Sequence, residues 1–281
     1  MEFFGSNVEK RSEKGENVII HAVFMRHGEK EYDPESPETG LTLAGEWDSR
    51  AFGQGRGRKS YIEPHASDAP RAMDTAKYAT EQSPTKDKRG LVLEDDLAFH
   101  YDPEGDFLKK VMEIKRDVLG ENPESLPDDE FGRRMFEANS KQADYYLSFG
   151  SQRPDPKTFS PVETASGIAV MVHKIIGNIK EVESGSEIDH INGTHDFNLA
   201  AFLKEIMIRK VGDQKIRGFD SVEEIGGSFN FTESFEVLIK TDEKGREETK
   251  LIFRGKEYDL DMGRLNELVE INNNLKTRED E

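Results

Sequence analysis

The stretch Val18-Ile-Ile-His-Ala-Val-Phe-Met25, followed directly by Arg26-His27-Gly28-Glu29, decides the fold. Its first eight residues are mostly apolar and β-branched, a pattern typical of a strand buried on both faces of a parallel sheet. The four residues that follow end the strand abruptly. In α/β sheets, ligands bind beyond the carboxyl ends of the strands. We therefore expect a functional site at the junction that contains His27.

The segments after this junction alternate between helix and strand. We expect a helix over Thr42–Gln54, a strand over Lys59–Ala66, a helix over Ala69–Glu81 and a short strand over Leu91–Glu94. Thr42 is a typical N-cap residue. The order β-α-β-α-β is that of a layered α/β domain. The sequence thus predicts a three-layer helix–sheet–helix sandwich with a mostly parallel sheet.

Helical patterns dominate the part of the chain between Phe99 and Pro161. Two predicted helices, Gly105–Leu119 and Asp128–Phe149, are separated and followed by segments rich in proline and charged residues. Long segments between the elements of a compact domain often carry function. We interpret residues 99–161 as a helical insertion over one end of the sheet and as a candidate lid over the substrate.

The rest of the chain completes the domain. The patterns predict helices at Pro161–Val182, Phe197–Lys210 and Met262–Asn272, and strands at Glu187–Gly193, Glu233–Lys240 and Thr249–Arg254. The last two strands flank Asp242-Glu-Lys-Gly245, a hairpin signal. We therefore expect a charged segment over 1–17, one domain over 18–270 with its hairpin at about 233–254, and a charged tail over 271–281.

The composition excludes several classes of protein. The 281 residues carry a formal net charge of −18 at pH 7 and contain no cysteine. An acidic surface repels phosphate backbones and anionic lipids, and the lack of cysteine excludes disulfides and thiolate nucleophiles. No apolar run approaches the ~20 residues that span a bilayer, and the N-terminus turns polar after Phe4, unlike a signal peptide. We expect a cytoplasmic enzyme without nucleic-acid or membrane partners.

Two histidines share the same local context. His27 follows one predicted strand, and His195 follows another and begins a helix. Arg26 lies beside the first histidine, and Arg71 stands in the first turn of the helix after a third strand. Arginine and histidine side chains around a helix N-terminus form a strong anion site. The sequence therefore predicts a site for a phosphoryl group.

The other five histidines do not share the spacing of metal ligands, and the acidic runs do not match a calcium-binding loop. We expect structural or surface roles for them, with His100 and His190 as supports of the site, and we expect no metal and no cofactor. These five histidines are His21, His65, His100, His173 and His190.

Four blocks resemble those of the histidine phosphatase superfamily, whose fold is that of phosphoglycerate mutase. Phe24–Glu29 resembles its RHG signature, Leu41–Gly45 its LTxxG helix start, and Ser67–Ala76 its SxxxRAxxTA segment. Gly193–Ala201 resembles the second-histidine block, in the HD-x-N-L form of the acid phosphatase and phytase branch. The blocks occur in the family's order and bracket residues 18–210. The part of the chain over 18–270 is thus similar to a histidine phosphatase domain.

The resemblance implies a two-step phosphoryl transfer. His27 attacks phosphorus and becomes a phosphohistidine, which water then hydrolyses. Gly28 is expected to let a backbone carbonyl hold the other imidazole nitrogen. Arg26, Arg71 and His195 are expected to bind the non-bridging oxygens and to stabilise the charge on them. The implied partner is a small phosphorylated substrate, and the oligomeric state is left open.

The resemblance offers two candidates for the general acid. In the phytase-like branch the acid is the residue after the second histidine, which is Asp196 here. In the mutase-like branch it is a glutamate after the third strand, which corresponds to Glu94. We favour Asp196 and keep Glu94 as the second choice. An alternative role for Asp196 is that of an N-cap of the following helix.

The chain departs from both branches after the first histidine, where it reads RHGEKEYD. The asparagine of mutase-type sites and the arginine of phytase sites are absent. Glu29 and Lys30 are candidates for contacts to the non-phosphate part of the substrate, and Ser67 is either a phosphate ligand or a loop hydrogen bonder. The alternatives to a small-molecule phosphatase are a mutase-type phosphotransferase, a protein phosphatase and a non-catalytic phosphate-binding member.

Overall fold

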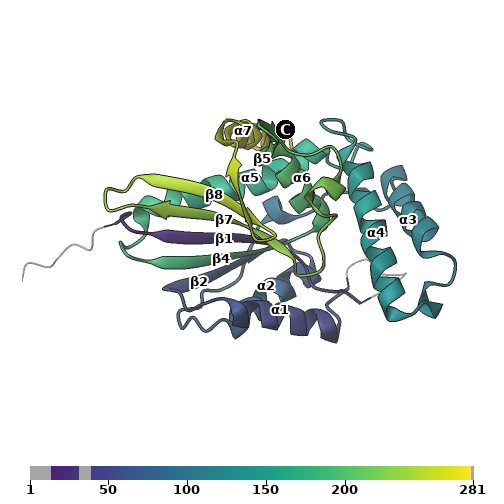
Figure 1. Cartoon of the computed structure of the whole chain (residues 1–281), viewed down its shortest axis with the longest axis horizontal. Coiled ribbons are helices and arrows are strands. Elements are labelled where there is room, and N and C mark those ends of the chain that lie inside the picture. The colour runs from purple at the N-terminus through teal and green to yellow at the C-terminus, as the bar shows by residue number, and fades with distance from the viewer. Residues whose placement is uncertain (1–13, 32–38, 280–281) are drawn as a thin grey trace, which may run out of the picture.

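The computed structural model describes residues 14–31 and 39–279. Within these residues nine strands form one sheet, in the order β3-β2-β4-β1-β7-β8-β9-β5-β6 (Figure 1). The strands are β1 Ile19–Arg26, β2 Tyr61–Ala66, β3 Val92–Leu93, β4 Glu187–Thr194, β5 Met207–Val211, β6 Gln214–Arg217, β7 Ser234–Thr241, β8 Glu247–Phe253 and β9 Lys256–Leu260. The helices are α1 Leu43–Gly55, α2 Pro70–Gln82, α3 Asp106–Leu119, α4 Asp128–Leu147, α5 Pro161–Asn178, α6 Asp196–Ile206 and α7 Met262–Glu279, with short 3₁₀ turns at η1 Asp95–Leu97, η2 Pro123–Ser125, η3 Ile179–Glu181 and η4 Val222–Ile225.

Strand β1 lies inside the sheet and divides it into two halves. It pairs in parallel with β4, with Arg26 opposite Thr194, and β4 pairs in parallel with β2. The side-chain amide of Asn192 on β4 donates to the carbonyl of Val23 on β1 at 3.0 Å, across 169 positions of sequence. Strands β3, β2, β4 and β1 therefore end at one edge, where His27 and His195 follow β1 and β4.

The expectation of a mostly parallel sheet is correct for those four strands and wrong for the other half. Strands β7, β8, β9, β5 and β6 all pair antiparallel. Short connections account for the β7–β8, β8–β9 and β5–β6 pairs, since two antiparallel strands can be joined by a few residues whereas parallel strands need a long crossover. The β8–β9 turn consists of Arg254 and Gly255, both with positive φ. The sandwich is thus a mixed α/β fold.

The two faces of β1 pack against different helices, which confirms that the strand is buried on both sides. Its residues Ile20, Ala22 and Phe24 join the core that includes α5 and α6. Val23 and Met25 join a smaller core with the alanines of α2. Figure 1 shows α1 and α2 on one side of the sheet and α5, α6 and α7 on the other. The helix–sheet–helix layering predicted from the sequence is confirmed.

The two helices predicted between residues 99 and 161 are α3 and α4, which lie together at one end of the molecule in Figure 1. An aromatic cluster connects them to the domain, because Phe107 of α3 and Tyr146 of α4 both contact Phe197 of α6. The hydroxyl of Tyr146 also lies 2.6 Å from that of Thr164 on α5. The insertion is therefore anchored beside the first turn of α6, which follows His195.

Two predictions about the C-terminal half are wrong. The helix expected over Phe197–Lys210 ends at Ile206, and Met207–Val211 forms strand β5 because its backbone pairs with β6 and β9. The tail expected over 271–281 continues α7 as far as residue 279. Lys276 of that helix forms an ion pair with the buried Asp96 at 2.8 Å, and Leu275 is buried.

The charged segment expected over 1–17 lies outside the described residues up to position 13. The amide of Gly15 donates to the carbonyl of Val182, so the described end of this segment is bound to the domain. Among the described residues, no helix has both the length and the apolar character needed to cross a membrane.

Candidate active site

Two buried imidazoles meet at the carboxyl edge of the parallel strands. The ring centroids of His27 and His195 are 5.5 Å apart and the rings are inclined by 65°. Both side chains come from residues that are less than a tenth exposed. The parallel pairing of β1 with β4 sets this distance, because each histidine is the first residue after its strand. The structure therefore places the two histidines side by side.

The ring of His27 is held in one tautomer. Its Nδ1 lies 2.8 Å from the carbonyl oxygen of Gly28, which accepts a hydrogen bond and has none to donate. The proton therefore sits on Nδ1, and Nε2 keeps its lone pair. Burial lowers the pKa of His27 well below its usual value, and the charges of Arg26 and Arg71 and the ring of His195 lower it further. His27 is thus a neutral imidazole whose Nε2 lone pair is held in a fixed orientation.

Gly28 allows the chain to pass close to α1. A Cβ at this position would lie 2.8 Å from the carbonyl oxygen of Gly45 and 3.1 Å from the hydroxyl of Ser49. The amide of Gly28 donates to the hydroxyl of Thr75 on α2 at 2.8 Å. The glycine therefore connects the His27 junction to the first two helices, and a side chain there has no room.

His195 is the N-cap residue of α6 and contacts the end of β2. Its Nε2 lies 3.1 Å from the hydroxyl of Ser67, a fully buried residue that follows β2. Burial lowers the pKa of His195 to about 3, and the nearby charges of Arg71 and Arg26 contribute. His195 is therefore neutral before an anion binds. Ser67 serves at least as the hydrogen-bond partner that the sequence suggested.

Arg26 is buried and its guanidinium is held from three sides. It donates to the carbonyl of Phe229, lies over the ring of Phe231 at 4.5 Å, and lies 3.7 Å from a carboxylate oxygen of Asp196. Burial lowers the pKa of Arg26 from its usual value. Arg71, in the first turn of α2, is close enough to act on Arg26 and on both histidines. The four cationic or imidazole side chains predicted from the sequence therefore form one cluster.

Asp196 connects this cluster to the loop before β7. Both of its carboxylate oxygens lie 2.7 Å from the hydroxyl of Ser228, and one accepts from the amide of Phe229 at 3.2 Å. The N-cap position of α6 belongs to His195, so the alternative of Asp196 as a helix cap is wrong. Burial raises the pKa of Asp196, which favours a carboxyl that holds a proton.

Glu94 has other partners. One of its oxygens lies 3.4 Å from Nδ1 of His65 and the other lies 3.3 Å from the ammonium of Lys174. The carboxylate of Glu94, the second candidate acid, therefore contacts a different group of side chains from those around His27. Of the two candidates, Asp196 is the one in contact with Arg26.

The two substrate-binding candidates after Gly28 lie at the start of α1. The carboxylate of Glu29 accepts from the hydroxyl of Thr42, the N-cap residue, at 2.9 Å. Lys30 forms a backbone bridge with Leu41, and its charge contributes to the lowered pKa of His195. Lys30 therefore lies near the histidine pair, whereas Glu29 is engaged with α1.

The loop that precedes β7 was missed by the sequence analysis. Phe229 and Phe231 contact Arg26, and the amide of Thr232 donates to the carbonyl of His27 at 3.4 Å. Gly226 and Gly227 both have φ near +90° and begin this loop. That glycine pair is the one local signal of a tight turn, and it does not reveal that the next residues reach the first histidine.

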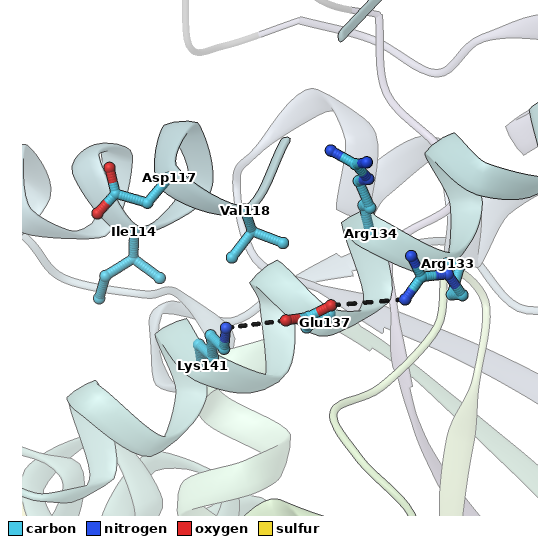
Figure 2. Close-up of a pocket in the computed structure, with 7 residues that line it drawn as sticks. All are labelled: Ile114, Asp117, Val118, Arg133, Arg134, Glu137 and Lys141. Carbon is cyan, nitrogen blue, oxygen red and sulfur yellow. Dashed lines mark hydrogen bonds and ion pairs between the residues drawn. The ribbon is translucent and has the colours of Figure 1, made fainter. Parts of the chain in front are cut away.

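A groove of about 420 Å³ lies in the insertion between α3 and α4 (Figure 2). Glu137 spans its floor, with ion pairs to Lys141 at 2.8 Å and Arg133 at 3.7 Å. The groove is separate from the histidine cluster. On the neighbouring face of α3, burial and the charge of Arg26 lower the pKa of Lys115, so the insertion extends to the cluster. The lining residues are Ile114, Asp117, Val118, Arg133, Arg134, Glu137 and Lys141.

Among the described residues, one group of side chains has the spacing of metal ligands. Glu63 and His65 on β2 and His190 on β4 place one ligand atom each within 4.8 Å of the others. This group lies apart from the cluster around His27.

No protein-family model and no curated protein matches the chain. Among solved structures, a mycobacterial glucosyl-3-phosphoglycerate phosphatase is similar at 14% identity and a TM-score of 0.47, over 82% of this chain and 97% of that one. A phosphoserine phosphatase from Entamoeba histolytica is similar at 14% identity and a TM-score of 0.45, over 86% and 95%. A protein described as mycobacterial hydrolase 2 is similar at 14% identity and a TM-score of 0.48, over 90% and 98%.

Proposed function

We propose that the protein is a histidine phosphatase that hydrolyses a phosphomonoester through a phosphohistidine on His27. The observation that carries the proposal is the His27–His195 pair, 5.5 Å apart, with Nδ1 of His27 bound to the carbonyl of Gly28. An imidazole with its lone pair on Nε2 and its proton fixed on Nδ1 is a suitable nucleophile toward phosphorus. The resemblance of the four sequence blocks to the superfamily supports the same reading.

The first half-reaction transfers the phosphoryl group to the protein. Nε2 of His27 forms a bond to phosphorus while the bond from phosphorus to the leaving oxygen breaks. Asp196, whose pKa is raised by burial, gives its proton to that oxygen. Arg26, Arg71 and His195 bind the three non-bridging oxygens, and an incoming dianion raises the pKa of His195. The leaving group departs as an alcohol.

The second half-reaction returns the enzyme to its starting state. Asp196, now ionised, takes a proton from water as the water oxygen forms a bond to phosphorus. The bond between phosphorus and Nε2 of His27 breaks, and inorganic phosphate leaves. The Gly28 carbonyl remains bound to Nδ1 throughout, which keeps the ring in place as the charge on it rises and falls.

The test is to trap the intermediate. The protein is mixed with p-nitrophenyl phosphate, quenched in alkali and analysed by mass spectrometry. We expect one added phosphoryl group on the peptide that contains His27, none in His27→Asn, and a loss of turnover of at least about 10³-fold in that variant. The exposed His173 provides the matched control, His173→Asn, which retains both the label and turnover. Wild-type turnover in folded His27→Asn overturns the mechanism.

The same mixture separates hydrolysis from phosphotransfer. A phosphatase releases one inorganic phosphate for each p-nitrophenol, with or without an added alcohol. A mutase-type phosphotransferase releases less phosphate when an acceptor alcohol is present, because the acceptor takes the group from His27. A non-catalytic phosphate-binding member gives neither product nor label.

A further inference from the structure

The strongest feature outside the proposed active site is a cluster of histidine and carboxylate side chains on β2 and β4. Glu63 and His65 stand two positions apart on β2 and therefore on one face of the strand, and Glu63 pairs with His190 on β4. Nδ1 of His190 lies 3.8 Å from a carboxylate oxygen of Glu63. The rings of His65 and His190 are 5.7 Å apart.

Two histidine nitrogens in this cluster lack hydrogen bonds. Nε2 of His65 and Nδ1 of His190 are buried atoms without a hydrogen-bond partner, while Nδ1 of His65 lies 3.4 Å from the carboxylate of Glu94. A buried polar atom in this state costs free energy unless a further group binds it. Burial lowers the pKa of His190 to about 3 and also lowers the pKa of His65, so both imidazoles are neutral at physiological pH. Neutral imidazoles with available lone pairs are the form that binds metals.

We propose that Glu63, His65 and His190 bind a divalent transition metal of the zinc class. Two imidazoles and one carboxylate form a ligand set that zinc accepts, at ligand distances of about 2.0–2.2 Å. The three ligand atoms already lie within 4.8 Å of one another, whereas a tetrahedral zinc separates its ligands by about 3.3 Å. Small rotations of partly exposed side chains close that difference. The proposal does not depend on the phosphatase activity.

The surroundings of the cluster fit a metal site. Glu94 lies 3.4 Å from Nδ1 of His65, where its carboxylate accepts the ring proton when the other nitrogen binds the metal. Such a carboxylate–histidine–metal arrangement orients the ligand and raises its basicity. Two cations face the same carboxylates, since Arg89 lies 3.7 Å from Glu63 and Lys174 lies 3.3 Å from Glu94.

The cluster also lies next to the candidate active site along the chain. From His65, strand β2 runs through Ala66 to Ser67, whose hydroxyl contacts Nε2 of His195. A metal shared by β2 and β4 fixes these two strands at the level just before the catalytic residues. It thus stabilises the fold without entering the reaction.

The test is a zinc titration of the full chain, without an affinity tag and after removal of metals with a chelator. Calorimetry is expected to show one zinc ion per chain in the wild type. His65→Gln and His190→Gln weaken binding at least 100-fold, and Glu63→Gln weakens it at least tenfold. The exposed His173 provides the control variant His173→Gln, which binds as the wild type does. Circular dichroism checks that each variant folds, and the partly exposed Glu63 gives a variant that leaves both rings in place.

Two further measurements make the result unambiguous. His27→Asn retains the zinc site if the metal binds at the β2–β4 cluster, and loses it if the metal binds at the His27–His195 pair. Zinc raises the melting temperature of the wild type and of His27→Asn, and it has no such effect on His190→Gln. The proposal is overturned if the wild type binds no zinc, if His65→Gln and His190→Gln bind as tightly as the wild type, or if only His27→Asn loses the metal.

Discussion

Nδ1 of His27 lies 2.8 Å from the carbonyl oxygen of the residue that follows it, Gly28. The His27 ring is therefore oriented by its own neighbour in the chain, and that neighbour is a glycine because α1 passes directly beside it. Position 28 thus serves two purposes at once: its carbonyl sets the tautomer of His27, and its missing side chain lets Gly45 approach.

Gly28→Ala tests this dual role. The new Cβ meets the Gly45 carbonyl at 2.8 Å, so the junction or α1 must move. Overpacking of this kind costs about 1–3 kcal/mol of unfolding free energy, and the displaced carbonyl reorients His27. We expect lower stability in urea unfolding together with a fall in kcat. The control is Gly55→Ala at the open end of α1, which keeps both the stability and the kcat of the wild type. Unchanged kcat in Gly28→Ala contradicts the orienting role.

Ser67→Ala removes the contact between β2 and His195. A hydrogen bond of this type contributes about 0.5–1.5 kcal/mol, so we expect kcat on p-nitrophenyl phosphate to fall roughly three- to tenfold. The matched variant Ser148→Ala, at the exposed end of α4, leaves kcat unchanged. An equal kcat in both variants places Ser67 outside the catalytic geometry.

Asp196→Asn distinguishes a general acid from an anchor of the loop before β7. Asparagine retains the hydrogen bonds to Ser228 and Phe229 and carries no acidic proton. General acid catalysis contributes about 10²–10⁴-fold and matters most for poor leaving groups. We expect a loss of that size in kcat/KM on an alkyl phosphomonoester and a loss of less than about tenfold on p-nitrophenyl phosphate. Equal losses on both substrates assign Asp196 to positioning alone.

Lys30→Ala tests the contact to the non-phosphate part of the substrate. Lys30 lies near His195, and its charge can attract an anionic group of the substrate that is not transferred. Loss of such uniform binding raises KM more than it lowers kcat. In steady-state kinetics on the best phosphomonoester of a panel, we expect Lys30→Ala to raise KM more than it lowers kcat. The control Lys256→Ala, on the exposed face of β9, changes neither KM nor kcat. Unchanged KM removes Lys30 from the site.

The buried histidines predict how stability depends on pH. The pKa of His190 is about 3 in the folded protein and near 6.5 in the unfolded chain. The unfolded chain therefore binds more protons than the folded protein between about pH 3 and 6.5. The free energy of unfolding rises with pH across this range, and the contribution of His190 is fully present above pH 6.5. His27, His65 and His195 act in the same direction, whereas the raised pKa of Asp196 acts against them.

Urea unfolding between pH 4.5 and 7.5, in the presence of a chelator, measures this dependence. Each buried histidine raises the free energy of unfolding by at most about 1.4 kcal/mol per pH unit in this range. His190→Gln lowers the slope below pH 6.5, and His173→Gln, at an exposed position, leaves it as in the wild type. A slope in His190→Gln equal to that of the wild type contradicts the lowered pKa.

The elements that could be predicted are those whose own residues carry the signal for helix or strand. The apolar run of β1 and the N-cap at Thr42 each carry their own signal, and the four motif blocks placed His27, His195, Arg26 and Arg71 at one edge. Strand β5 was taken for helix, and the two-residue turn Gly212-Asp213 that joins it to β6 was missed. Its other partner is β9, where Ile208 pairs with Asp259 and Met207 with Leu260, 51 and 53 positions away. Such long-range pairing leaves no mark on a local pattern.

Two parts of the molecule could not be predicted for the same reason. The loop before β7 reaches Arg26 only because β7 pairs antiparallel with β1. His65 and His190 have no common spacing in sequence, and only the β2–β4 register places them together. The choice of Asp196 over Glu94 as the proposed general acid rests on partners that are visible only in three dimensions, since Asp196 contacts Arg26 while Glu94 contacts His65 and Lys174.

The pairing of β1 with β4 also governs when the site comes into being. Asn192 and Val23 are joined across 169 positions of sequence, and contacts between such distant segments form slowly because a large loop must close first. Helices form within about a microsecond, long before the two histidines meet. On dilution from denaturant, phosphatase turnover therefore returns with the slowest folding phase and lags behind the recovery of helical signal. Turnover thus reports the completion of the fold.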